Sequence, residues 1–422
     1  MLLKHLEHSL QSPFCIYGAG IVATSVYTAI KTIYHKTPLF FLISDSADKE
    51  ERSDVSPAEI DGIVVKGMSE WKQELAALVS TCKRQGEDNR LGVQKSADVL
   101  ITYLIAVPEM HHMAIMETLH STDFVKVSIK EPHIILVTNT LENALMGAYY
   151  SRRPKCATVS DLLSVARAWE SKQTATWQNE VAASAMQIFQ AKSHMDKPLR
   201  GQQSLSVNQS SVLPRYITPI QVGAALTNCR IVDLQDNQGD NISAKNRNYS
   251  ELTATYYAWK HSRAVYKGIC HYRRIFDISD EQMKRLLELE QEWDVILPYP
   301  SVYYPNIARE HVRYVNESDW NAMLQALQET APEYLEAYEK GIADGERFFN
   351  NFNMLIAKAE VFDDYCNFLF TVLERTEELT MPKGSERADR FAGYLGENLT
   401  TLYILKNRER LKIAYAGKIW ML

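Results

Sequence analysis

Residues 14–23 read Phe-Cys-Ile-Tyr-Gly-Ala-Gly-Ile-Val-Ala, and this stretch decides the fold of the first part of the chain. Its first four residues are apolar and predict a short buried strand, while the pattern from Ile21 to Tyr34 predicts a helix. Between the two lies a G-x-G-x-x-A turn, whose glycines let a backbone approach a diphosphate at a helix amino terminus. The same glycines also serve plain helix–sheet packing, so both interpretations stay open.

Further strand patterns follow, each separated from the last by a helical or polar stretch. They are Leu39–Ser44, Gly62–Val65, Val99–Val107 and His133–Val137. This alternation is typical of a parallel sheet with crossover helices. We therefore predict an α/β protein whose residues 1–155 form a Rossmann-like domain with an accessory site for a nucleotide or nucleotide-sugar. The candidate residues of that site are Gly18, Gly20, Ala23 and, after the second strand, Asp45.

Composition narrows the class of protein. The 422 residues predict two or three domains, and the formal charge of −6 disfavours a nucleic-acid binder. No apolar stretch reaches the roughly 18 residues of a membrane helix, and the amino terminus lacks the pattern of a secretory signal. The six cysteines form no CxxC pair and are interpreted as reduced thiols. A cytoplasmic protein is expected.

The pattern changes after the first domain. A long helix is predicted within 156–184, where it connects two domains, and 201–211 is expected to be an exposed loop. The second domain, 185–422, begins with a strand that ends in a polar loop containing His194. Further along, the strand Ala264–Cys270 is followed by His271-Tyr272-Arg273-Arg274. Two arginines at a strand end favour a phosphorylated ligand, although a solvated basic turn is the simpler alternative.

Two polar strings carry a resemblance. They are GDNIS-x-KN-x-x-Y-x-E at Gly239–Glu251 and CHYRR-x-F at Cys270–Phe276, with Phe352-Asn353-Met354 further on. Together they resemble a family of bacterial capsular-polysaccharide and O-antigen biosynthesis proteins, long labelled a domain of unknown function and now regarded as glycosyltransferases of GT-A-like fold. The resemblance covers about Met186 to Leu405. It implies sugar transfer from a UDP-sugar, plausibly of galactose or galactofuranose, to a glycan or lipid-linked oligosaccharide acceptor.

On this interpretation, a set of polar residues binds the donor. The set is His194, Asp240, Asn241, Lys245, Tyr249, Glu251, His271, Arg273, Arg274 and Asn353. Many GT-A enzymes hold a divalent metal with Asp-x-Asp, but this chain contains no such motif. We therefore expect Arg273 and Arg274 to offset the charge of the leaving diphosphate, with no cofactor required. The alternative is an Mn²⁺ or Mg²⁺ site built from Asp240, His271 and Glu251.

An inverting transfer needs a base for the acceptor hydroxyl. Glu397, after the glycine-flanked turn Arg390–Gly396, is the first candidate and is similar to the acidic turn of several GT-A galactosyltransferases. Asp319 is the second candidate and His311 the third. Glu397 could instead cap a helix, and Asp319 could complement a helix dipole. The tyrosine-rich loop 299–304 is expected to stack on a sugar or to join the core.

The last stretch, 406–422, carries five basic residues against Glu409, interleaved with apolar ones. It is interpreted either as a peripheral contact with an anionic membrane or as a terminal helix docked on the domain. Two other functions stay open. One is an NAD-dependent nucleotide-sugar oxidoreductase or epimerase, and the other is a non-catalytic polysaccharide-assembly protein.

Overall fold

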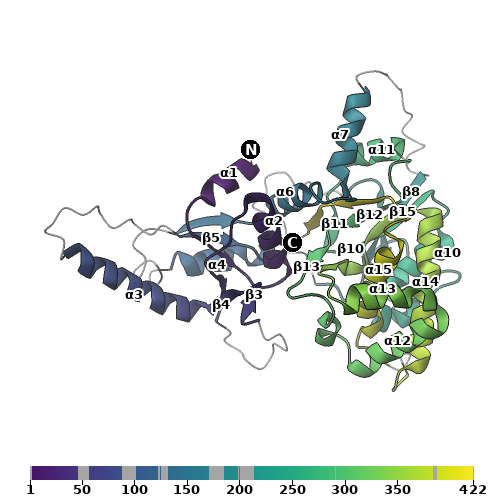
Figure 1. Cartoon of the computed structure of the whole chain (residues 1–422). Coiled ribbons are helices and arrows are strands. Elements are labelled where there is room, and N and C mark those ends of the chain that lie inside the picture. The colour runs from purple at the N-terminus through teal and green to yellow at the C-terminus, as the bar shows by residue number, and fades with distance from the viewer. Residues whose placement is uncertain are drawn as a thin grey trace. The chain divides into compact units, whose positions relative to one another are not determined.

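The computed structural model describes residues 2–45, 57–87, 101–121, 124, 132–170, 185–197, 199, 213–289, 291–383 and 387–421. The chain divides into two compact units, Met1–Tyr149 and Tyr150–Leu422 (Figure 1). The predicted boundary after residue 155 therefore falls just inside the second unit, and the predicted loop 201–211 lies outside the described residues. None of the described helices is long and apolar enough to cross a membrane.

The first unit is built on a mostly parallel sheet, as predicted. Its strand order is β3-β4-β2-β1-β5-β6, and all neighbours are parallel except β3 and β4. The strands are β1 (Phe14–Tyr17), β2 (Phe41–Ile43), β3 (Glu59–Ile60), β4 (Ile63–Gly67), β5 (Thr102–Ile105) and β6 (His133–Leu136). The helices are α1 (Leu2–Ser9), α2 (Ile21–Tyr34), α3 (Met68–Glu87), α4 (His112–Leu119) and α6 (Asn139–Tyr150), which ends at the boundary.

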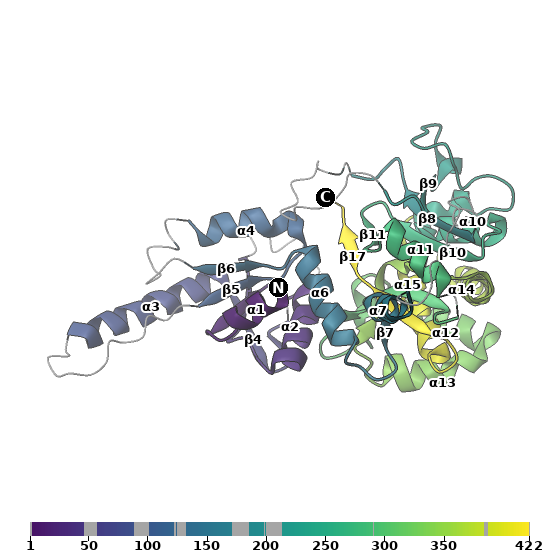
Figure 2. The ribbon, with the colours of Figure 1, turned by 90° about the horizontal axis from the view of Figure 1, so that it is seen from above.

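Helices cover both faces of this sheet, which explains why its strands are apolar throughout. Cys15 and Tyr17 of β1 belong to a core cluster with Trp71 of α3 and residues of α4. Because neighbouring side chains of a strand point to opposite faces, Phe41 of β2 lies on the other side from Phe40 and Leu42. There it meets Tyr27 of α2, with ring centroids 5.5 Å apart. Figure 2 shows this sheet from above.

The second unit contains a mixed sheet. Its path is β17-β11-β10-β15-β12-β16-β7, and β8 and β9 extend it from β10. The strands are β7 (Ala157–Thr158), β8 (Met186–Lys192), β9 (Ile217–Gln221), β10 (Tyr266–His271), β11 (Arg274–Phe276), β12 (Val295–Pro298), β15 (Leu355–Lys358), β16 (Ile413–Ala416) and β17 (Lys418–Trp420), with β13 (Ser301–Val302) and β14 (Phe348–Phe349) forming a separate pair.

The helices of the second unit include two long ones that position the candidate site, α14 (Ala359–Leu379) and α15 (Phe391–Asn407). The others are α7 (Val159–Glu170), α9 (Asn246–Tyr249), α10 (Leu252–His261), α11 (Asp280–Glu288), α12 (Glu317–Thr330) and α13 (Leu335–Ala337). The predicted connecting helix corresponds to α7, and β7 precedes it in the sheet of the second unit. Residues 171–184 lie outside the described part of the chain.

The prediction of a terminal helix in the basic stretch 406–422 is wrong. Residues 413–420 form β16 and β17 instead, and α15 ends at Asn407. β16 lies between β12 and β7, and β17 pairs with β11. Burial alternates along β16, where Ala414 and Ala416 are buried and Ile413 and Tyr415 are partly exposed, as expected for a strand, and Lys418 of β17 is itself buried.

Candidate functional site

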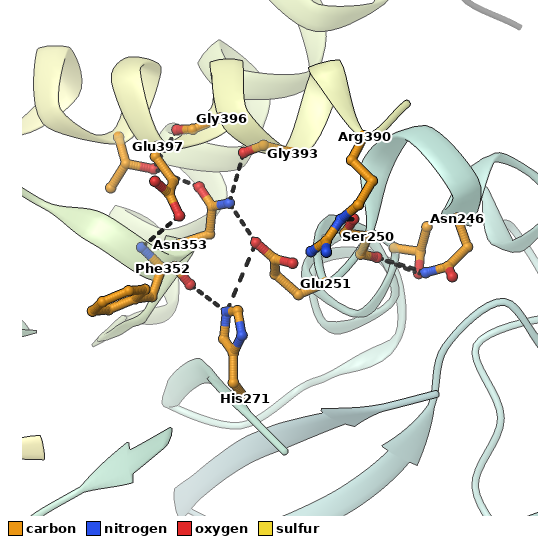
Figure 3. Close-up of polar contacts among 12 residues, drawn as sticks. Asn246, Ser250, Glu251, His271, Phe352, Asn353, Arg390, Gly393, Gly396 and Glu397 are labelled. Atoms are coloured by element: carbon orange, nitrogen blue, oxygen red, sulfur yellow. Dashed lines mark hydrogen bonds and ion pairs between the residues drawn. The ribbon is translucent and has the colours of Figure 1, made fainter. Parts of the chain in front are cut away.

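Three segments that are far apart in the sequence meet where β10 ends. His271 is the last residue of β10, and the short helical turn η7 (Asn351–Asn353) precedes β15, which runs antiparallel beside β10. The third segment is α15. His271 Nε2 donates to the carbonyl of Phe352 at 2.5 Å, and it lies 3.7 Å from Glu251 Oε1 (Figure 3). Burial lowers the pKa of His271, which favours the neutral ring with its hydrogen on Nε2.

The turn at η7 has an unusual backbone. Phe352 and Asn353 both have positive φ, 75° and 48°, a region that non-glycine residues rarely enter. Asn353 is fully buried, and its amide donates to Glu251 Oε1 at 2.7 Å and to the carbonyl of Gly393 at 3.0 Å. Its oxygen accepts from Thr400. These contacts hold the strained turn in place and fix the direction of the Phe352 peptide.

Glu397 contacts Phe352 at its backbone N–H, in the peptide group before the one that His271 contacts. Its Oε1 accepts the backbone N–H of Phe352 at 2.9 Å (Figure 3). Burial and, after it, the charge of Glu251 raise the pKa of Glu397 to about 8, against the lowering effects of the Phe352 N–H, Arg274 and Arg390. The backbone of Phe352 thus links His271, at its carbonyl, to Glu397, at its N–H, and the pKa of that carboxyl group is close to neutral pH.

Small residues let α15 approach this turn. A Cβ atom on Gly396 would lie 2.7 Å from Leu252 Cδ1 and 3.1 Å from Asn353 Oδ1. The Gly393 carbonyl is itself a partner of Asn353. In the sequence these glycines flank an expected aromatic turn, but the structure places both inside α15. Their spacing three residues apart on a helix, one turn before the acid, is the signal that a close contact exists on this face.

Arginines surround the acids. Arg274 begins β11 after a tight turn, and its guanidinium lies 4.2 Å from the Phe352 ring and 4.0 Å from the Trp420 ring. Burial lowers its pKa to about 10, so it remains a cation at neutral pH. The Nε atoms of Arg273 and Arg274 are buried and have no hydrogen-bond partner among the described residues. These unpaired donors are compatible with an anionic ligand, and binding of such a ligand by the pair stays a prediction.

Sequence reasoning missed a third arginine. Arg390 stands before α15 with φ of 64°, and its Nε donates to Ser250 Oγ at 2.9 Å (Figure 3). The turn after β8 lies nearby, because both Arg273 and Arg390 act electrostatically on Asp196 in that turn. His194, in the same turn, is exposed. Arg390 was hard to find because its role depends on a loop-to-helix junction that carries no motif.

Several predicted donor-binding residues make contacts elsewhere. Lys245 forms an ion pair with Glu377 of α14 at 2.6 Å, and buried Tyr249 donates to the same carboxylate at 3.3 Å. Asp240 is exposed and accepts from Tyr256 at 3.1 Å. Asn241 closes a local turn through Gly239 and Ser243. Of the donor-binding candidates within Gly239–Glu251, the structure places Glu251 beside Asn353 and His271, and Ser250, which was not a candidate, accepts from Arg390.

The two other candidate bases are held by protein partners. Asp319 is 1% exposed, and both of its oxygens accept from Arg387, at 2.7 and 2.6 Å. It also lies in the first turn of α12. His311 is buried and stacks on Trp320 with ring centroids 3.7 Å apart. These contacts favour a structural role for both residues.

The aromatic loop 299–304 joins the core, which is one of the two predicted outcomes. Tyr299 is buried and stacks on Tyr150 with centroids 5.4 Å apart. Tyr303 is also buried, and its hydroxyl accepts from Asn351 at 3.0 Å. An aromatic surface for a sugar therefore has to be sought in another part of the unit.

In the first unit, the glycine turn lies between β1 and α2. Gly18 has φ of 125°, and a Cβ there would lie 2.6 Å from the carbonyl oxygen of Ala106, so packing requires this glycine. A Cβ on Gly20 would meet open space. Asp45 accepts from the Ser69 N–H with both oxygens at 3.0 Å, at the start of α3. This helix contact competes with the predicted role of Asp45 on a ribose.

No metal centre is found in the described ranges, since no three His, Cys, Asp or Glu side chains there are grouped to hold an ion. Of the alternative ligand set proposed from the sequence, Glu251 and His271 lie together. Asp240 instead contacts Tyr256 and His261.

Most residues of the candidate site lie in a stretch of the chain that matches a known protein family. Residues 207–408, just under half of the chain, match a family described as a domain of unknown function, DUF4422. No curated protein matches the chain. Among solved structures, the apo structure of the bifunctional glycosyltransferase WbbM is similar, with a TM-score of 0.46 and 23% identity, over 56% of this chain and 45% of that one. This chain thus spans less than half of that protein, and the likeness assigns no activity.

Proposed function

We propose that the second unit is a GT-A-like glycosyltransferase that moves a sugar from a UDP-sugar to a hydroxyl group of a glycan acceptor. The observation that carries the proposal is Glu397, a carboxyl group with a pKa of about 8 near half-buried arginines at the end of a sheet strand. The motif resemblance of Gly239–Glu251 and Cys270–Phe276 supports the same chemistry.

The proposed step is an inverting displacement. The acceptor oxygen attacks the anomeric carbon of the sugar, and its proton passes to the Glu397 carboxylate. The bond between that carbon and the phosphate oxygen breaks, and UDP leaves with the electron pair. A base is most effective when its pKa lies near the working pH, and a pKa of about 8 meets this condition.

The arginines have the complementary role. Arg274 and Arg273 present Nε donors that the described residues do not use, and Arg390 lies on the far side of Glu251 in Figure 3. Fixed cations stabilise a leaving diphosphate because its negative charge grows as the bond breaks. The neutral His271 and Asn353 act as positioning residues, because they hold the backbone of Phe352, whose N–H contacts Glu397.

The finer parts of the proposal follow the motif resemblance. They are a galactose or galactofuranose donor, a lipid-linked acceptor at the cytoplasmic face of a membrane, and metal-independent transfer, with Mn²⁺ or Mg²⁺ as the alternative to be tested. We also propose a separate nucleotide site at the amino terminus of α2, where the open space at Gly20 leaves room for a phosphate.

The test uses the full chain and a panel of UDP-sugars, with and without Mn²⁺ or EDTA. Glu397→Gln is expected to keep UDP binding and to lower transfer at least about 100-fold. Arg274→Gln is expected to weaken UDP-induced thermal stabilisation, whereas Arg410→Gln, an exposed arginine paired with Asp364, is the matched control. Full turnover by Glu397→Gln would overturn the assignment, and stabilisation of the protein by NAD alone would favour an oxidoreductase.

A further inference from the structure

We propose that Tyr314, stacked on Tyr394, forms a platform for a pyranose ring of the acceptor glycan. This inference rests on the proposed function, because it assigns one substrate of the same site. Tyr314 is 50% exposed, and its ring lies 4.8 Å from that of Tyr394 at an angle of 17°. A half-exposed tyrosine ring backed by a parallel ring is a suitable surface for stacking of a flat sugar ring.

The platform lies one helical turn from Glu397. Tyr394 and Glu397 stand three residues apart in α15, so their side chains share one face, and Arg390 precedes the helix as its N-cap. The Arg390 guanidinium lies 5.8 Å from the centre of the Tyr394 ring. A sugar ring stacked on the tyrosine pair therefore lies near Glu397, the candidate base, and near the Arg390 guanidinium.

A second observation brings Tyr314 to the same place independently. Burial raises the pKa of Tyr303, and the nearby charges of Glu310, Glu397 and Tyr314 raise it further. Tyr303 is thus within electrostatic range of both the Tyr314 hydroxyl and Glu397. Tyr303 also accepts from Asn351, a residue of the η7 turn. Tyr314 and Glu397 hence both lie near one buried tyrosine.

The backbone beneath Tyr314 is anchored. Tyr314 follows the turn η4 (Glu310–Arg313), and its N–H donates to the carbonyl of His311 at 3.0 Å. The His311 ring is stacked on Trp320 of α12 at 3.7 Å. A platform that is already fixed before binding loses little conformational entropy when the ligand arrives. This contact gives His311 a supporting role in place of the catalytic one predicted for it.

The chemistry of the surface favours a saccharide over other ligands. A pyranose presents C–H groups on its faces and hydroxyl groups on its edges. Tyrosine offers an apolar face with a hydroxyl at its rim, so it matches both parts. The nearby Glu397 and Arg390 supply an acceptor and donors for the ring hydroxyls. The donor diphosphate instead belongs with the half-buried arginines on β11 and its turn.

The experiment compares Tyr314→Ala with Tyr314→Phe, using lactose and octyl β-galactoside as probes in the presence of UDP. Binding is followed by saturation-transfer NMR, and transfer by product formation. Tyr314→Ala is expected to weaken binding of the saccharide and raise its KM roughly tenfold, whereas Tyr314→Phe retains most of the affinity. UDP affinity and the slow hydrolysis of UDP-sugar in the absence of acceptor should stay unchanged in both variants.

The outcomes separate this inference from the proposed function. If the wild type hydrolyses UDP-sugar but binds neither saccharide, the platform is wrong and the transferase proposal stands. The same conclusion follows if Tyr314→Ala leaves saccharide binding intact, or if it raises the KM of the donor instead. If the wild type neither binds UDP nor hydrolyses any UDP-sugar, the proposed function fails, and the platform assignment fails with it.

Discussion

Replacing Glu397 with Gln should change how the stability of the second unit depends on pH. The side chain is held by the Phe352 N–H, which a glutamine oxygen can also accept. The substitution therefore removes the titratable proton of residue 397 and keeps this hydrogen bond. The experiment therefore isolates the titration of one carboxyl group in a site where both the proposed mechanism and the fold depend on its charge.

The sign follows from the two pKa values. In the unfolded chain Glu397 titrates near the ordinary 4.5, and in the folded protein near 8. Below pH 4.5 the group is protonated in both states. Between 4.5 and 8 only the unfolded state releases the proton, so the stability of the wild type falls as the pH rises. Above pH 8 the wild type has lost this stability completely. The stability of the glutamine variant does not change with pH in this way.

The magnitude can be worked from the same values. The pKa differs by about 8 − 4.5, or 3.5, and each pKa unit corresponds to about 1.4 kcal/mol. The upper limit is thus about 5 kcal/mol. Because Glu397 is partly exposed, about half of this is a better expectation. In a unit of this size, about 2.5 kcal/mol corresponds to a Tm difference of roughly 5–10 °C.

The assay is thermal unfolding followed by tryptophan fluorescence from pH 5 to 8.5. Six of the seven tryptophans follow Tyr150, and Trp293 is fully buried, so the signal reports mainly the second unit. Tm of Glu397→Gln minus Tm of wild type should rise across this range. Glu339→Gln, a change at an exposed glutamate of the same unit, is the control and should give a constant difference.

A flat difference for Glu397→Gln would refute the reasoning. It would mean that Glu397 titrates at an ordinary value, and the argument for a base poised near neutral pH would be lost. With the assay extended down to pH 3, a difference that falls as the pH rises to 4.5 and is flat above it would be more damaging, because it would show that the arginines outweigh burial and hold the carboxylate ionised.

Three further changes test the surrounding structure. Asp319→Asn should lower the stability of the second unit by about 3 kcal/mol, because it breaks a buried ion pair; lost transfer at unchanged Tm would instead restore Asp319 as a catalytic candidate. Gly18→Ala should cost roughly 1–3 kcal/mol in thermal unfolding, whereas Gly20→Ala should leave Tm unchanged and abolish any stabilisation of the first unit by NAD or UDP. Gly396→Ala should lower Tm and weaken UDP binding together; a normal Tm would show that α15 has room to move.

Local patterns predicted the first unit well. Its strand–turn–helix motif and alternating strands are confirmed as a mostly parallel sheet covered by helices. In the second unit the structure brings together Glu251, His271 and Arg274, named from the polar strings, and Glu397, named from a glycine-flanked turn that is in fact part of α15; their roles stay a prediction. For the basic end of the chain, the interpretation as a terminal helix is wrong, because its apolar residues fill two short strands.

The sequence by itself determined the class of fold and most of the charged groups of the site, because these depend on local periodicity and residue type. Only the tertiary structure decided which groups act on one another. The pKa of Glu397 comes from burial and from Glu251, 146 positions away (397 − 251). Arg390, Asn353 and the tyrosine pair gain their roles from contacts between distant segments. Burial and charge pairing are properties of three-dimensional packing, and no spacing along the chain records them.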